Sequence, residues 1–263
     1  MDSQISKSFQ LLNESKLSEA LRELDGLLYS LCKITPDTEK RSQSIRGGST
    51  RRIGNANMSA QLYGRKQTRE FIRLQDCYIY NITGHLMEYL LKTTRGEEGI
   101  TDDELVLCLE ILQGACLLHY QSRQVFCSDA SMEFLISSLE SSKSSKVQIA
   151  LINTVVSVMV REVYNIRKFE QLKGLAVICN LFKNKETAKD VKLRILEFLF
   201  FYLIPETRVH DKNGTNTKQH GQRTERKTTE EKQALLGRYL SNVSGLVREL
   251  NMSRPFGDMD LEW

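Results

Sequence analysis

The sequence predicts an all-α protein built as an armadillo/HEAT-like helical repeat solenoid. Two stretches between residues 126 and 204 resemble each other at an offset of roughly 43 residues, which lies within the range of such repeats. Apolar residues recur at helical spacing through most of the chain, and the presence of only 3 prolines allows long helices. One such unit cannot bury its apolar face alone, so the units stack and present a long surface to other proteins.

The match between the two stretches is carried by large apolar residues. At an offset of roughly 43, the matched pairs are Phe126 with Phe169, Met132 with Leu175, Phe134 with Val177, and Leu135 with Ile178. After a short polar loop the offset becomes roughly 44, which pairs Val147 with Val191 and Leu151 with Ile195. We therefore expect a helix on each side of that loop in both copies.

The amino-terminal part predicts one helix followed by a basic loop. Residues 17–34 carry leucines at helical spacing, and Pro36 ends the helix. Residues 36–58 are rich in serine, glycine and basic side chains, which is typical of a flexible segment. The loop is either a solvated linker, a phosphorylation site (Arg46 lies three residues before Ser49), or a docking arm for acidic partners.

Two further helices are expected before the matched repeats. Residues 68–92 form a long amphipathic pattern, and Gly96 marks the break after it. Thr101 and the three acidic residues that follow it suit the start of a helix that continues over residues 105–119. These two helices are either an earlier, degenerate repeat or a cap on the solenoid.

The last repeat helix, residues 187–204, is apolar almost all round, which predicts a central and buried position. Arg194 and Glu197 lie on its narrow polar line, which Phe201 interrupts. Phe201 is either packed by a neighbouring segment or part of a partner site. We take Arg194, Glu197 and Phe201 as candidate partner-binding residues.

The carboxyl-terminal part divides into a polar segment, a helix and a tail. Residues 1–205 are predicted to form one helical domain. Residues 206–229 have almost no apolar content, which predicts a disordered polar insertion in that domain. Residues 230–263 hold an amphipathic capping helix of the same domain and a tail. Phe256 in that tail joins the candidate partner-binding residues, because an apolar tail docks on its own domain or on a partner.

The bulk composition is that of an ordinary globular chain of 263 residues with a formal net charge of +4. The 6 cysteines show no zinc-ligand spacing and most fall in apolar helical stretches, so we expect buried free thiols in a reducing compartment. No signal peptide and no bilayer-spanning run is present in the sequence, which predicts a cytoplasmic or nuclear protein without membrane insertion.

The sequence shows no constellation that would carry catalysis. It holds no phosphate-binding GxxxxGK[ST] loop, no kinase signature, no GxSxG elbow, and no cysteine followed six places later by arginine. Cys116 and His119 share a helical face but have no third member, so they are interpreted as a packed pair. We therefore expect that the protein is not an enzyme and that it binds no metal, no cofactor and no small-molecule substrate.

Two blocks of the chain resemble the fungal cell division control protein fourteen family, a non-catalytic component of the septation initiation network. Residues 169–207 read FEQLKGLAVICNLFKNKETAKDVKLRILEFLFFYLIPET, and residues 232–257 read KQALLGRYLSNVSGLVRELNMSRPFG. The aromatic run to Tyr202, the closing Ile204-Pro205-Glu206 and the Pro-Phe-Gly ending are similar to that family. An unrelated dual-specificity phosphatase shares the number, and the missing cysteine-to-arginine spacing excludes it.

The resemblance implies an armadillo-like scaffold that binds a protein kinase of the germinal-centre class. Such a subunit would act in the cytoplasm at the spindle pole body and promote septum formation and cytokinesis. The alternative is an armadillo-type adaptor for other protein cargo or for nucleic acid. Nucleic acid is the less favoured partner, because the basic residues concentrate in a loop instead of lining a groove.

Overall fold

The computed structural model describes residues 1–32, 65–96, 99–206 and 226–253, and within these ranges every regular element is a helix. In chain order the elements are α1 Asp2–Asn13, α2 Leu17–Cys32, α5 Lys66–Gln75, η1 Tyr78–Tyr80, α6 Ile82–Thr94, α7 Asp102–Leu118, η2 Tyr120–Cys127, α8 Asp129–Ser141, α9 Ser145–Met159, α10 Val163–Gln171, α11 Gly174–Lys183, α12 Lys189–Leu203, α13 Thr229–Leu236 and α14 Val243–Ser253. The prediction of an all-α chain is confirmed for these residues.

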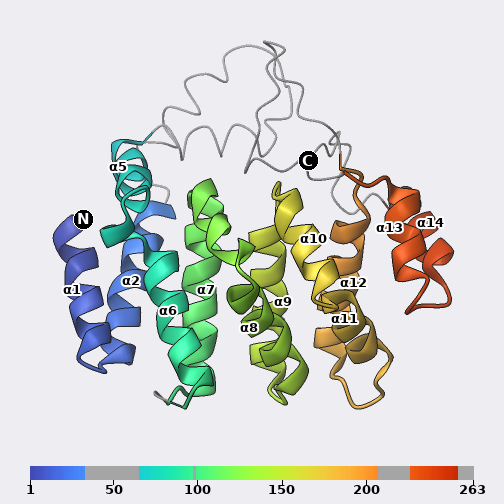
Figure 1. Ribbon diagram of the computed structural model, residues 1–263, viewed down its shortest axis with the longest axis horizontal. Helices are drawn as coiled ribbons and strands as arrows, with labels where there is room; N and C mark the ends of the chain where they lie inside the picture. Colours follow the sequence, from blue (N-terminus) through green and yellow to red (C-terminus); the bar gives the residue numbers. More distant parts are fainter. Residues whose placement is uncertain (33–64, 97–98, 207–225, 254–263) are drawn as a thin grey trace, which may run out of the picture.

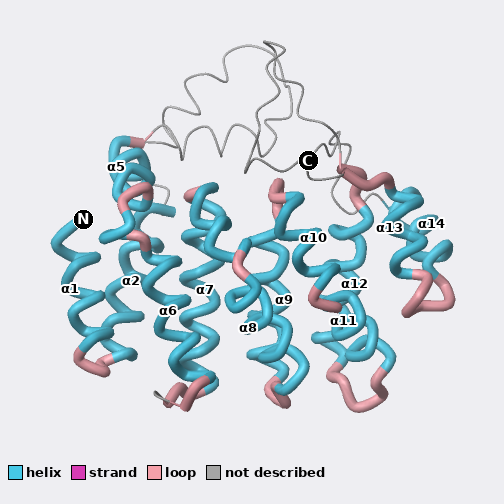
Figure 2. The backbone as a smooth tube through the Cα atoms, in the orientation of Figure 1, coloured by secondary structure: helices cyan, strands magenta, loops and turns pink. Residues whose placement is uncertain are grey.

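The helices follow one another along the longest axis of the molecule, from α1 at one end to α14 at the other (Figures 1 and 2). In one layer α2, α7, α9 and α12 contact each other in succession. A second layer contains α1, α6, α8 and α11, which also contact their neighbours in chain order. Each helix therefore packs mainly against elements that lie near it in the sequence.

The helix boundaries agree with the offset between the two matched stretches. Helix α9 covers Ser145–Met159 and α12 covers Lys189–Leu203, so both the start and the end are displaced by 44 residues. The matched Phe126 and Phe169 lie in the short elements η2 and α10, and both side chains are completely buried.

The prediction of one long helix over residues 68–92 is wrong, because the chain turns between α5 and α6 and forms two helices. Gln75 is buried at this corner, where its Oε1 accepts a hydrogen bond from the Ile82 backbone at 2.8 Å and its Nε2 donates to the Tyr80 carbonyl at 2.9 Å. Asn81 then caps α6 by accepting from the Gly84 backbone at 2.8 Å. These side chains satisfy backbone groups that a continuous helix would satisfy itself.

The single capping helix expected from residue 230 is also two helices, α13 and α14. Between them Leu240 turns into the core, and Asn242 accepts a hydrogen bond from the Gly245 backbone at 3.2 Å, at the start of α14. Helix α1 is a further element that the sequence pattern did not predict, and its Ile5, Phe9 and Leu12 pack against the rest of the chain.

One continuous cluster of buried apolar residues runs from Ile5 to Val243. Its largest completely buried rings include Phe71, Phe126, Phe169 and Phe198. Cys108, Cys116 and Cys179 are buried as expected and Cys127 is half-buried, but Cys32 and Cys77 are exposed, which corrects the expectation of buried thiols at these two positions. The predicted loop over 36–58 and most of the predicted 206–229 insertion lie outside the described residues.

Candidate functional site

The structure separates the residues that the sequence suggested for partner binding. Arg194 and Glu197 form an ion pair on the exposed side of α12. Phe201 is only 7% exposed and its ring lies 6.4 Å from that of Phe198, which is the packing alternative rather than an accessible contact. Phe256 lies outside the described residues. Two of the four residues therefore lie together on the surface.

His119 lies between a serine and an aspartate, and the histidine and serine are buried while the aspartate is exposed. Its Nδ1 is 2.9 Å from Ser122 Oγ and its Nε2 is 3.0 Å from Asp76 Oδ1. Because His119 is 1% exposed and Ser122 is completely buried, no substrate reaches the serine hydroxyl. The contacts instead join η2 to the turn that follows α5.

The neighbouring Cys116 is equally unsuited to nucleophilic chemistry. Its thiol is completely buried, and burial raises its pKa to about 12. A thiol attacks as the thiolate, and this one keeps its proton at neutral pH. The interpretation of Cys116 and His119 as packed residues agrees with this geometry.

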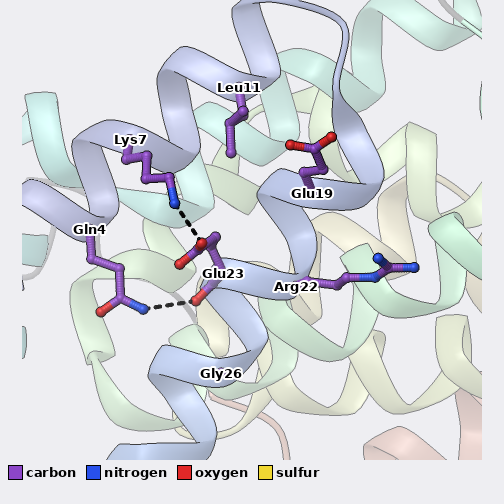
Figure 3. A pocket seen from close by; sticks show the side chains of 7 residues that line it. All are labelled: Gln4, Lys7, Leu11, Glu19, Arg22, Glu23 and Gly26. Carbon is purple, nitrogen blue, oxygen red and sulfur yellow. Dashed lines mark hydrogen bonds and ion pairs between the residues drawn. The ribbon is translucent and has the colours of Figure 1, made fainter.

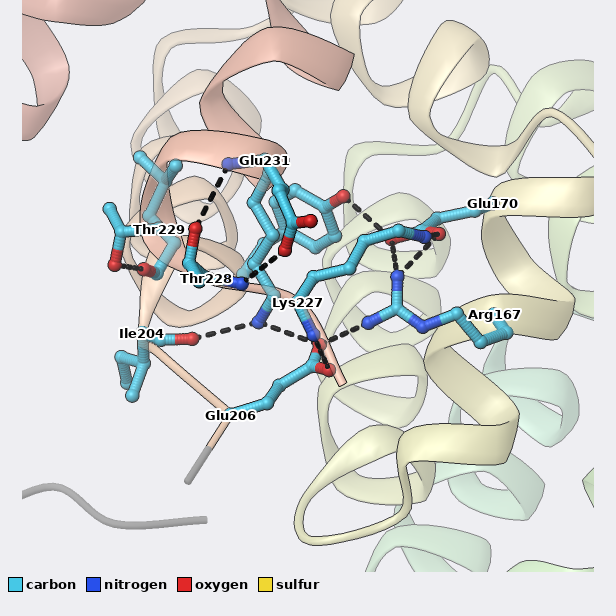
Figure 4. Close-up of polar contacts among 11 residues, drawn as sticks. Arg167, Glu170, Ile204, Glu206, Lys227, Thr228, Thr229 and Glu231 are labelled. Atoms are coloured by element: carbon cyan, nitrogen blue, oxygen red, sulfur yellow. Dashed lines mark hydrogen bonds and ion pairs between the residues drawn. The ribbon is translucent and has the colours of Figure 1, made fainter. Parts of the chain in front are cut away.

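The most extensive polar arrangement lies where α13 joins α12 and α10, and we call it the C-terminal latch (Figure 4). Its members are Arg167, Glu170, Tyr202, Glu206, Lys227 and Lys232. Glu206 and Lys232 are completely buried side chains, whose Oε1 and Nζ atoms lie 2.9 Å apart. Charged side chains are rarely buried, and a buried charge needs a partner. The cluster therefore differs from an ordinary helical core, which is apolar.

The latch fastens the chain on both sides of the segment 207–225. Glu206 also pairs with Arg167 and accepts a hydrogen bond from the Lys227 backbone at 2.9 Å. Lys227 Nζ lies 2.6 Å from Glu170 Oε2, and Lys232 Nζ donates to the Ile204 carbonyl at 2.7 Å. These contacts hold the start of α13 against α10 and the end of α12.

Burial sets the electrostatics of the latch. Desolvation lowers the pKa of Lys232, and the nearby Glu206 carboxylate opposes that shift. Burial, with a further contribution from the charge of Glu170, raises the pKa of Tyr202 well above its usual range. The Tyr202 hydroxyl accordingly stays protonated and donates to Glu170 Oε1 at 2.7 Å. The latch is thus a structural joint made of charges.

Sequence reasoning missed the latch, although one signal was present. Lys232 lies four residues before Leu236, so it occupies the apolar stripe of α13. A lysine on such a stripe needs a buried partner, but that partner, Glu206, lies in a segment whose placement the sequence pattern did not specify.

A shallow groove lies between α1 and α2 (Figure 3). It is lined mainly by polar side chains, including Gln4, Lys7 and Glu23. Lys7 Nζ lies 2.8 Å from Glu23 Oε1, and Gln4 donates to the Glu23 carbonyl at 3.3 Å. These contacts pair the polar groups of Gln4, Lys7 and Glu23 with one another, which leaves the groove without a group of unusual chemistry.

Neither a metal centre nor a membrane span is found in the described part of the chain. Over residues 1–32, 65–96, 99–206 and 226–253, no three histidine, cysteine or carboxylate side chains lie close enough to hold a metal ion. None of the helices described is long and apolar enough to cross a bilayer.

The comparison with known proteins gives one consistent result. The family described as Cell division control protein 14, SIN component, matches residues 1–256. A protein of Schizosaccharomyces pombe named Cell division control protein 14 is 36% identical over 203 residues, which cover 72% of this chain and 79% of that protein. No solved structure matches the chain.

Proposed function

Because this chain belongs to the cell division control protein 14 family, a component of the septation initiation network that acts in cell division, we propose that it is a non-catalytic kinase-binding subunit. The proposed partner is a protein kinase of the germinal-centre class. The proposed outcome of binding is septum formation and cytokinesis, with the complex held at the spindle pole body in the cytoplasm.

The observation that carries this proposal is the continuous row of helices α2, α7, α9 and α12. Such a row presents one long, rigid face, and we propose that the fold is an armadillo-like solenoid on this basis. Solenoids of this kind use their extended surfaces to bind other proteins. Binding would favour one state of the kinase, or would concentrate it at its site of action, through differential affinity.

The polar groups of the interior also support a role in binding rather than in catalysis. His119 contacts Ser122 and Asp76, and the latch residues contact one another, so both sets of polar groups join different helices or turns. Catalytic side chains need access to a substrate, and these groups stabilise the joints between helices instead.

The test is purification of the tagged protein from its own cells under gentle conditions, followed by mass spectrometry. We expect a germinal-centre-class kinase in near-equal amount. Deletion of the gene should then lower the activity of that kinase or displace it from the spindle pole body. A preparation that contains other cargo, or nucleic acid removed by nuclease, and no kinase would instead support the adaptor function.

A further inference from the structure

One edge of the helix row carries a group of lysines that local structure does not explain. The edge is formed by the α8–α9 turn, the α11–α12 loop and the first turns of α9 and α12, which lie beside each other in the row (Figure 1). We call it the lysine edge, and its members are Lys143, Lys146, Lys183, Lys185, Lys189 and Lys192.

Within the described residues, the six lysines have no ion-pair partner that would explain why they gather here. All but Lys192, which is half-buried, are exposed, and none forms an ion pair with any residue in the described ranges of the chain. Glu140, Glu186 and Asp190 are the carboxylates on the same turns, so six lysines face three acids. The edge therefore has a net positive charge.

The position of two of these lysines is unfavourable for the helices themselves. The helix dipole favours acidic side chains in the first turn of a helix, but the first turn of α9 holds Lys146 and no acid, and that of α12 begins with Lys189 beside a single acid, Asp190. Neither helix has a side-chain cap. By contrast, α7 begins in the same row with Thr101, Glu104 and a complete capping box. A departure from local preference without a compensating contact indicates a functional requirement.

An exposed apolar side chain lies next to the lysines. Leu193 is 58% exposed and follows Lys189 by one helical turn. On α9 the half-buried Ile149 follows Lys146 in the same way. Ile149, however, packs against the core, so the edge is a band of positive charge beside one exposed apolar side chain, Leu193.

We propose that the lysine edge and Leu193 dock an acidic segment of the partner protein that also carries apolar side chains. This inference rests on the proposed function, because it names the surface that holds the partner. Charge complementarity selects the acidic residues, and Leu193 selects the apolar ones. Nucleic acid fits less well, because the edge has no arginine for bidentate phosphate contacts and a phosphate backbone offers no apolar group to Leu193.

The test compares two triple variants with the same change in net charge. The first is K146E/K185E/K189E on the lysine edge. The control is K66E/R69E/R73E, which reverses three exposed basic residues of α5. Affinity for the co-purified kinase should fall about tenfold or more in the first variant and stay within about threefold in the control. Leu193→Ser should weaken binding by about fivefold without a change in the salt dependence.

Equal affinity of the two triple variants would overturn the inference while leaving the proposed function intact. If the wild-type protein binds no kinase, the proposed function fails, and the edge is tested alone with a labelled peptide of glutamate and leucine. Binding of that peptide that is lost in the first variant only would still support the edge. Tighter binding to phosphatidylserine vesicles or to duplex DNA than to the peptide would overturn it.

Discussion

Two glycines in helices differ in the space that surrounds them, and this difference gives a stability prediction at the scale of single residues. A Cβ atom on Gly174 would overlap the ring of Phe169, whereas a Cβ on Gly26 would meet no atom within 4 Å. Gly174→Ala should therefore lower the free energy of unfolding by about 1–3 kcal/mol. Gly26→Ala should raise it by up to about 1 kcal/mol, because alanine favours the helix.

Urea unfolding followed by circular dichroism measures both glycine variants on the same scale. The Gly26 variant is the matched control, because it makes the same chemical change on an open helix surface. Equal effects of the two substitutions would show that Phe169 is not packed against the start of α11 as the structure has it.

The cysteines divide into reactive and protected groups. Burial raises the pKa of Cys108 and of Cys116 to about 12, and both side chains are completely buried. Cys32 and Cys77 are exposed. Iodoacetamide at pH 8 should label Cys77 readily and Cys32 more slowly, because partial burial raises the pKa of the Cys32 thiol, and should leave Cys108 and Cys116 unlabelled until the protein unfolds, as peptide mass spectrometry would show.

The same pKa shifts have a consequence for stability in alkali. The unfolded chain releases its thiol protons near an ordinary pKa of about 8.5, while the folded chain keeps those of Cys108 and Cys116 up to about 12. Their contribution to stability is therefore complete below the unfolded pKa and is lost as pH rises toward the folded value. A free energy of unfolding that stays constant from pH 8 to pH 11 would contradict this assignment.

At the scale of elements, the latch determines how α13 is held. Lys232→Met keeps the length of the side chain but leaves Glu206 with one buried cation fewer, and the Ile204 carbonyl loses its donor. We expect a loss of about 3 kcal/mol in the free energy of unfolding. Proteolysis should also cut earlier in the region of α13, because its attachment to α12 is weakened.

The double variant K232M/E206Q is the control for the latch. In the single Lys232 variant Glu206 keeps Arg167 as its partner, so neutralising Glu206 relieves only the part of its charge that Lys232 had balanced, and part of the lost stability should return. The loss in free energy of unfolding of the double variant should be smaller than the sum of the losses of the two single variants. A loss equal to or larger than that sum would contradict the interaction that the 2.9 Å separation of the pair indicates.

The elements also show what the sequence could and could not predict. The capping box at Thr101 and Glu104 was predictable, since all its atoms belong to one short segment. The corner at Gln75 and the turn before α14 were not, because apolar spacing continues across both and gives no sign of a break. The latch was beyond sequence reasoning for a related reason, as Arg167, Glu206 and Lys232 meet only through tertiary packing.

At the scale of the whole molecule, the row of helices gives each part a local neighbourhood. Helices α7 and α9 are flanked within their layer on both sides, while α1 and α14 lie at the ends (Figure 1). The repeat pattern predicted equivalent positions for matched apolar residues such as Phe126 and Phe169, and both side chains are completely buried. It did not predict which residues on the outer faces bind a partner, since surface residues carry no comparable constraint from packing.

This locality predicts that damage in one unit stays near that unit. Phe126→Ala and Phe169→Ala each remove a completely buried ring, at a cost of about 3–5 kcal/mol. If each unit contacts only its neighbours, native-state hydrogen exchange should accelerate mainly in the helices around η2, which are α6, α7, α8 and α10, for the first variant, and in α11 and α12 for the second. Amides of α1 and α2 should keep their wild-type rates in the Phe169 variant, because neither helix packs substantially against α10, α11 or α12. Uniform acceleration along the chain would instead mean that the row unfolds as one cooperative body. That result would contradict the proposed solenoid of stacked, semi-independent units.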